Sequence, residues 1–295
     1  MGTSKKSTPY ELCRYQGTKL SFRGPQKSFR GPYIATLGGT ETFGPFVQAP
    51  YPTLLEDWLD QTVVNLGVRQ AGVSLFASEQ WLLDCASKSD VAVLQVLGAG
   101  NMSNRLYSVH SRRNDRFLAV SPALKELFPE VDFTEFSFIR HLLQSLADRS
   151  SDGFEVLVEE LRFAWVQRMK RVLSCIDAPV IMLWMSDRSS STPAERPQGP
   201  EPLFVTKAMM GALEPLVASV VEVVASTEVD RLEGKQYTQM ERDAAYSAPT
   251  PVHHAQVAEQ LCNAIREIQM SRDVNCDASA IGRDRDEFMR SRTAI

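Results

Sequence analysis

The sequence has no long hydrophobic run, no excess of basic residues and no regular cysteine spacing. No stretch approaches the ~18 apolar residues of a membrane-spanning helix, and the polar N-terminus has no apolar segment like that of a signal peptide. The net charge of −4 provides no sustained positive field for phosphate groups. We therefore expect no membrane partner, no nucleic-acid partner and a cytoplasmic location.

Cysteine and histidine are both scarce. The five cysteines, at positions 13, 85, 175, 262 and 276, form an odd, scattered set without CxxC spacing, which predicts reduced thiols and no metal site. The sequence also lacks GxGxxG spacing and a Walker lysine, so a nucleotide-binding fold is disfavoured. We expect neither a metal nor a cofactor.

Apolar strand-like segments alternate with amphipathic helix-like segments along the chain. Strands are predicted at 33–37, 63–66, 91–97, 178–184 and 220–224, and helices at 51–59, 74–87, 131–146, 154–176, 209–216 and from 250 onward. Segment 91–97 is nearly continuous in apolar residues, which is typical of a strand covered on both faces. The pattern predicts an α/β fold, a three-layer αβα sandwich with a five-stranded parallel sheet.

We divide the chain into an N-terminal wrapping segment (1–32), a single α/β domain (33–267) with an insertion at 102–150, and a charged tail (268–295) that we expect to be mobile or loosely helical. The first segment carries Ser-Phe-Arg-Gly-Pro at 21–25 and again at 28–32, and its Gly-Pro pairs predict two turns.

The same repeat contains two aromatic and two basic side chains. Phe22 and Phe29 are expected to anchor the segment to the domain surface. Arg23 and Arg30 are expected to be solvated, and contact with an anion is the alternative.

The first strand ends in Gly38-Gly-Thr-Glu-Thr-Phe-Gly44, which predicts a tight turn and the start of a helix. Thr40 then lies at an exposed corner where backbone N–H groups favour a nucleophile or an anion. The alternative is that Thr40 only caps the helix.

This block, Val64-Asn-Leu-Gly67 and Gly98-Ala-Gly-Asn101 together resemble the first three blocks of the SGNH (GDSL) hydrolase superfamily. The superfamily pattern is Gly-Asp-Ser-x-Thr-x-Gly, then Asn-x-Gly, then Gly-x-Asn, with a late Asp-x-x-His. The whole chain resembles an alphaproteobacterial branch of SGNH-like proteins that carries the Gly-Gly-Thr-Glu-Thr-Phe-Gly block. The resemblance implies a flavodoxin-like strand order, with the three loops meeting in one crevice at the carboxyl ends of the strands.

The resemblance also implies roles for individual residues. Thr40 stands at the position of the nucleophilic serine, and Asn101 is the matching side-chain donor to an oxyanion. Gly39, Gly67 and Gly100 are the turn positions expected at the oxyanion hole. Two departures are that Gly39 replaces the superfamily aspartate and that a threonine replaces the serine.

The late histidine has its counterpart at the start of the last helix. His254 is the expected base, with His253 as the alternative and a purely structural pair as the second alternative. The aspartate three residues before the superfamily histidine is absent here.

Arginines cluster in the insertion directly after the third block. Arg105, Arg112 and Arg113 are expected to bind an anionic substrate, and internal Arg–Asp pairs are the alternative. Two functional hypotheses follow. The first is a hydrolase or acyltransferase acting on an ester of a small anionic or carbohydrate-like molecule. The second is a catalytically inactive SGNH-like protein that keeps the crevice for an anionic ligand.

Overall fold

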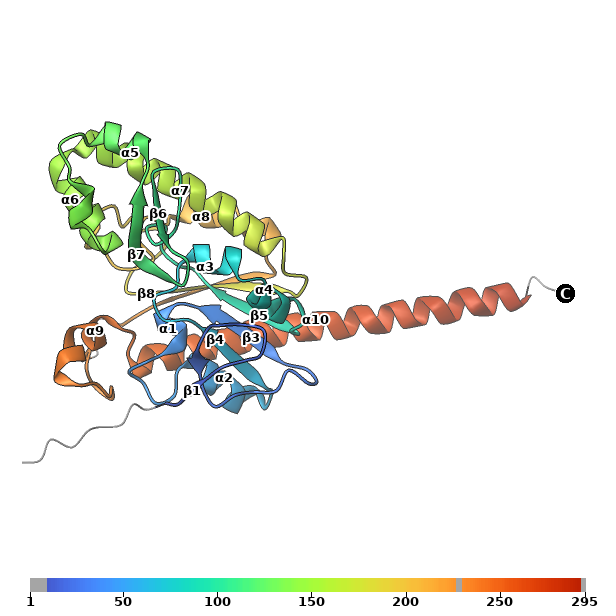
Figure 1. Ribbon diagram of the computed structural model, residues 1–295. Coiled ribbons are helices and arrows are strands. Elements are labelled where there is room, and N and C mark those ends of the chain that lie inside the picture. Colours follow the sequence, from blue (N-terminus) through green and yellow to red (C-terminus); the bar gives the residue numbers. More distant parts are fainter. Residues whose placement is uncertain (1–9, 227–229, 293–295) are drawn as a thin grey trace, which may run out of the picture.

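A parallel sheet forms the centre of the protein in the computed structural model, which describes residues 10–226 and 230–292 (Figure 1). The strands follow the order β4-β3-β5-β8-β9, and every neighbouring pair is parallel. Their bounds are Ile34–Gly38 (β3), Val63–Gly67 (β4), Val91–Gln95 (β5), Val180–Ser186 (β8) and Ser219–Val224 (β9). Counted along the chain this order is 2-1-3-4-5, so the predicted five-stranded sheet and its flavodoxin-like order are confirmed.

Helices cover both faces of the sheet. On one face, α2 (Tyr51–Leu59) packs with the start of α10 (Pro251–Arg292), around Tyr51 and Leu261. The other face carries α3 (Val73–Ser78), α4 (Gln80–Ser87) and α7 (Ser151–Leu173), with Trp165 of α7 fully buried. These layers confirm the predicted αβα sandwich.

Several helices differ from the predicted boundaries. Segment 74–87 is divided at Glu79, whose φ of −100° and ψ of 86° interrupt the helix. The long helix α7 begins at Ser151 because the Ser150 hydroxyl accepts the Gly153 N–H and caps it. The other divided segments are η1 (Phe133–Glu135) with α6 (Ile139–Arg149), and α8 (Lys207–Gly211) with η2 (Glu214–Leu216).

The insertion contains a hairpin that the sequence did not predict. Strands β6 (Tyr107–His110) and β7 (Arg113–Val120) pair antiparallel and are followed by α5 (Pro122–Leu127). Two short helices, η3 (Gln239–Glu241) and α9 (Arg242–Ser247), precede α10. The last helix continues through most of the charged tail to Arg292, and Figure 1 shows it extending beyond the sheet. Residues 293–295 of the predicted tail lie outside the described residues.

The N-terminal segment contains a short antiparallel pair, β1 (Leu12–Cys13) and β2 (Phe22–Arg23), while its residues 1–9 lie outside the described part. Phe22 is fully buried against Trp81, and Arg30 is exposed. The expectation for Arg23 was wrong. Its guanidinium is buried and donates to the carbonyl oxygens of residues 44, 47 and 48, so it fixes the loop after α1 (Thr40–Phe43).

Candidate functional site

A cavity of about 400 Å³ lies at the carboxyl edge of the sheet. Its wall includes Thr40 after β3, Gln70 after β4 and Asn101 after β5, so the three predicted loops do meet there. In the sheet, β4 pairs with one edge of β3 and β5 pairs with the other edge, so the strand order reverses at β3. The cavity therefore occupies the topological switch point, where doubly wound sheets bind ligands. Later segments complete the wall through Arg140, Met185, Glu201 and Ser247.

The two glycines at the end of β3 allow side chains to approach the backbone closely. A Cβ on Gly38 would come within 3.0 Å of Thr42 Oγ1 and Gln95 Oε1. A Cβ on Gly39 would lie 3.1 Å from Glu41 Oε2. The glycine pair thus leaves the space that polar side chains from α1 and β5 occupy.

Thr40 is the first residue of α1, and Gly39 occupies the N-cap position, so Thr40 is not the cap. Since α1 spans four residues, it supplies little of the helix dipole expected from the sequence. The Gln70 N–H donates to Thr40 Oγ1 at 3.0 Å. This bond uses a lone pair of the hydroxyl oxygen and leaves the hydroxyl proton for a ligand or a base.

Gln95, at the end of β5, orients the carboxyl of Glu41. The Gln95 side-chain oxygen accepts the Gly39 N–H at 2.9 Å and the Thr42 hydroxyl at 2.7 Å. Because both bonds require the oxygen, the amide nitrogen must face the other way, and it donates to Glu41 Oε2 at 2.9 Å. Glu41 also lines the cavity.

Burial raises the pKa of Glu41 above its ordinary value, and the charge of Glu201 adds to this rise against the opposing Gln95 bond. Neither Glu41 nor Gln95 was predicted from the sequence. A signal was present, because Gln95 is the one polar residue in the apolar segment 91–97.

Of the groups predicted to stabilise an oxyanion, two N–H groups already have acceptors within the protein, whereas the Asn101 amide has none in the described part of the chain. The Gly39 N–H is already engaged by Gln95, and the Gly67 N–H donates to the Asn65 side chain at 3.0 Å. Neither Gly67 nor Gly100 is among the residues that line the cavity. Asn101 does line it, and its amide has no hydrogen-bond partner among the described residues. Asn101 is therefore the available side-chain donor.

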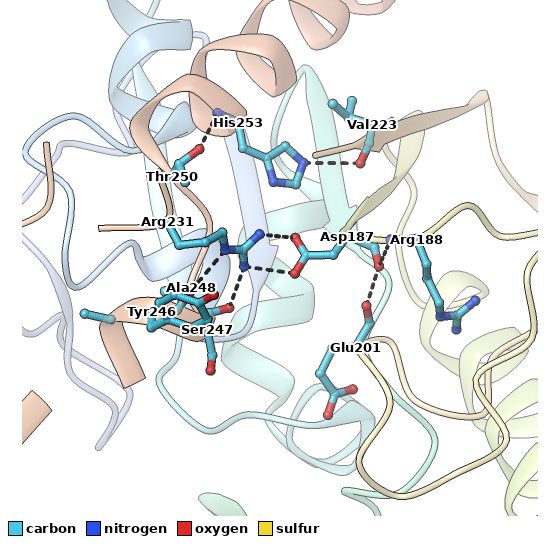
Figure 2. Close-up of polar contacts among 12 residues, drawn as sticks. Asp187, Arg188, Glu201, Val223, Arg231, Tyr246, Ser247, Ala248, Thr250 and His253 are labelled. Carbon is cyan, nitrogen blue, oxygen red and sulfur yellow. Dashed lines mark hydrogen bonds and ion pairs between the residues drawn. The ribbon is translucent and has the colours of Figure 1, made fainter. Parts of the chain in front are cut away.

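Both late histidines are buried, and neither is among the residues lining the cavity. His253 Nε2 lies 3.2 Å from the Val223 carbonyl oxygen (Figure 2), and His254 Nδ1 accepts the Tyr51 N–H at 3.2 Å. Burial lowers the pKa of both rings, that of His254 to about 3. The structure does not bring either imidazole together with Thr40, because both rings are hydrogen-bonded to backbone groups around the start of α10.

The three predicted substrate-binding arginines do not line the cavity either. Arg105 Nε donates to Glu160 Oε2 at 2.8 Å. The Arg112 side chain is exposed, and Arg113 forms an ion pair with Asp115 at 3.2 Å. Asp115 does line the cavity, so Arg113 contacts a cavity residue. Of the three arginines, Arg113 forms the internal Arg–Asp pair that was the alternative, whereas Arg105 pairs with a glutamate.

Two other arginines, Arg69 and Arg140, line the cavity instead. Arg140 donates to Glu201 Oε1 at 2.8 Å, and both side chains remain partly exposed. Phe138 adds an aromatic ring to the same wall. The cavity therefore presents charges of both signs beside an apolar surface.

Segment 244–249 contributes one wall of the cavity. A separate polar cluster holds this segment in place. Arg231 forms a bidentate ion pair with Asp187 at 2.8 and 2.9 Å and also donates to the carbonyl oxygens of residues 246 and 247 (Figure 2). Lys235 Nζ donates to the carbonyl oxygens of residues 245 and 248. This cluster fixes the backbone of the wall.

In the part of the chain that the structure describes, no helix is long and apolar enough to cross a membrane. Nor do three or more His, Cys, Asp or Glu residues gather there in a way that could hold a metal ion. Cys13, Cys85, Cys175 and Cys262 are free thiols, and the side chain of Cys276 lies outside the described part.

The solved structures to which the chain is similar at low sequence identity include the following three. The lipase Lip_vut3 from a goat rumen metagenome is 12% identical, with a TM-score of 0.40 over 79% of this chain and 97% of the lipase. LAE5, an α/β hydrolase from the metagenome of Lake Arreo, is 14% identical, with a TM-score of 0.42 over 80% and 95%. A G-D-S-L family protein from Desulfitobacterium hafniense DCB-2 is 13% identical, with a TM-score of 0.37 over 79% and 99%.

None of the curated protein sequences compared with the chain matches it. A family model does match residues 1–269, which is most of the sequence. The chain therefore belongs to the family described as Domain of unknown function (DUF6473).

Proposed function

We propose that the protein is a hydrolase or acyltransferase that uses Thr40 as its nucleophile on an ester of a small anionic or carbohydrate-like molecule. The observation that supports this proposal is that Thr40, with a free hydroxyl proton, and Asn101, with a free amide, line the same 400 Å³ cavity. Acyl transfer needs a nucleophile and a donor for the developing oxyanion.

Thr40 Oγ attacks the ester carbonyl, and the Asn101 amide donates to the oxygen that becomes negative. Loss of the alcohol leaves an acyl-threonine, which water or a second alcohol resolves. The charges of both signs on the wall, together with Phe138, suit a ligand with carboxylate or hydroxyl groups on a small apolar frame.

Hydrolysis of 4-nitrophenyl acetate by the wild type, Thr40→Ala and Thr40→Ser tests the proposal. Thr40→Ala should lower kcat/KM by about 10²-fold or more, whereas Thr40→Ser should retain or increase it because the crowding methyl is removed. Thr192→Ala, an exposed threonine outside the cavity lining, is the matched control. Equal rates for wild type and Thr40→Ala would leave Thr40 without a nucleophilic role.

A second function, ligand binding without catalysis, is favoured by the position of the two late histidines outside the cavity lining. On this hypothesis a panel of small carboxylates and acetylated sugars would raise the melting temperature without turnover. Thr40→Ala would then keep the same ligand-induced shift.

A further inference from the structure

We propose that Glu41 is the proton-transfer residue of this site, taking the hydroxyl proton of Thr40 and passing it to the leaving alcohol. The inference rests on the proposed ester-cleaving function and adds a catalytic residue to it. Glu41 directly follows Thr40, and both side chains line the cavity.

The Glu41 side chain folds back toward the start of α1. Its Oε2 would lie 3.1 Å from a Cβ placed on Gly39, so a side chain at position 39 and the Glu41 carboxyl compete for the same space. In the superfamily pattern that position carries the aspartate. Here position 39 is glycine, and a carboxyl lining the same cavity as Thr40 comes from the residue that follows Thr40.

A chain of hydrogen bonds, part-buried at Glu41 and buried beyond Gln95, orients the Glu41 carboxyl. Gln95 Nε2 donates to it, and the Gln95 oxygen is fixed by the Gly39 N–H and the Thr42 hydroxyl. Thr42 Oγ1 lies 3.0 Å from the Tyr51 hydroxyl, which continues the chain into the core. A carboxyl fixed in this way gains or loses a proton with little rearrangement, as a base in a preorganised site must.

The charged groups of the cavity wall besides Glu41 are Asp115, Glu201, Arg69 and Arg140. Burial is the main cause of the raised pKa of Glu41, and the charge of Glu201 adds to it. A carboxylate with a raised pKa binds a proton more readily and so is a better base than an exposed glutamate. None of the described residues that line the cavity is a histidine, so no imidazole is available there as the base.

The proton balance closes within the site. The Thr40 O–H bond breaks as Oγ bonds to the carbonyl carbon, and the proton moves to the Glu41 carboxylate. Collapse of the tetrahedral intermediate breaks the bond to the alcohol oxygen, which takes the proton from Glu41. Water then loses a proton to Glu41 as it attacks the acyl-threonine, and Thr40 recovers that proton as it leaves.

The test is the pH dependence of kcat/KM for 4-nitrophenyl acetate, from about pH 4 to about pH 9, in wild type, Glu41→Gln and Glu41→Asp. Because base catalysis contributes about 10²-fold or more, Glu41→Gln should lower kcat/KM by about that factor. It should also abolish the fall of kcat/KM at low pH, which we call the acid limb of the profile. Its amide oxygen still accepts from Gln95, and thermal melting checks that it folds. Glu41→Asp, which keeps a carboxyl, should retain the limb at an intermediate rate.

Glu56→Gln is the matched control, since Glu56 is a partly buried carboxylate on α2, paired with Lys27 at 2.7 Å and outside the cavity lining. Its profile should match that of wild type. If Thr40→Ala is inactive while Glu41→Gln keeps the wild-type rate and acid limb, the role of Glu41 is overturned and the proposed function stands. If wild type and Thr40→Ala have equal rates, both are overturned.

Discussion

Two polar clusters lie at the carboxyl edge of the sheet and use their hydrogen bonds in different ways. In the first, which we call the open cluster, Gln95 donates a hydrogen bond to Glu41, and both residues line the cavity together with Thr40. In the second, which we call the closed cluster, the side chains of Arg231 and Lys235 donate to backbone carbonyl oxygens of the 244–249 wall.

The open cluster has groups that are free to contact a ligand, whereas the groups of the closed cluster hold the backbone in place. Each long cation of the closed cluster has two carbonyl acceptors, so changing it should alter stability first. The open cluster leaves a hydroxyl proton and a carboxyl at the cavity surface, so changing Thr40 or Glu41 should alter chemistry first, whereas crowding the buried side of this cluster should lower stability as well. The predictions below test this division.

Gly38→Ala should have the largest effect, a loss of about 3 kcal/mol in the free energy of unfolding. The added methyl would come within 3.0 Å of Thr42 Oγ1 and Gln95 Oε1, so the core of the open cluster would have to shift. Ester cleavage should fall with it. Urea unfolding measures the loss.

Gly211→Ala is the control for that substitution, because a Cβ there meets no atom within 4 Å and Gly211 is in α8. It should leave stability unchanged or raise it by up to about 1 kcal/mol. If the two variants unfold at the same urea concentration, the close approach at Gly38 has no energetic significance.

Lys235 tests the closed cluster through pH. Burial lowers the pKa of Lys235 to about 8, whereas an unfolded lysine titrates near about 10.4. Between these values the unfolded chain binds more protons, so the contribution of Lys235 makes stability rise with pH by about 1 kcal/mol per unit. Below about pH 8 the amine is charged in both states and this slope disappears.

The measurement is urea unfolding of wild type and Lys235→Met from about pH 7 to about pH 10. The wild-type curve should gain stability relative to the variant as pH rises through that window. Parallel curves would mean that Lys235 is not held in a desolvated position. The acid limb of ester cleavage, which belongs to the open cluster, should be the same in both proteins.

The layers could be predicted from the sequence because they depend on apolar runs that the sheet buries, whereas the strand order came from the resemblance of the loop motifs to the SGNH hydrolases. The hairpin β6–β7 was missed because Arg113, Asp115 and Arg116 interrupt the apolar alternation of β7. Arg23 was placed in solvent because sequence does not reveal that three backbone carbonyl oxygens converge on it.

Within the site, the loops were predictable and the proton acceptor was not. Thr40 and Asn101 were found because each follows a strand and adjoins glycine. The position of His254 at the start of the last helix matched a pattern, but sequence position does not determine which way a ring points on a helix, and this ring faces Tyr51. Glu41 was overlooked because only the folded chain shows its carboxyl over Gly39.

Glu201→Gln should give the smallest effect and the most specific one for the open cluster. Because the charge of Glu201 raises the pKa of Glu41, its removal should move the acid limb of kcat/KM to lower pH. Arg140, paired with Glu201 at 2.8 Å, offsets part of that charge, so we expect only a small shift of the limb. A limb that moves to higher pH, or one that also moves in Glu56→Gln, would mean that the titrating group is not a carboxyl beside Glu201.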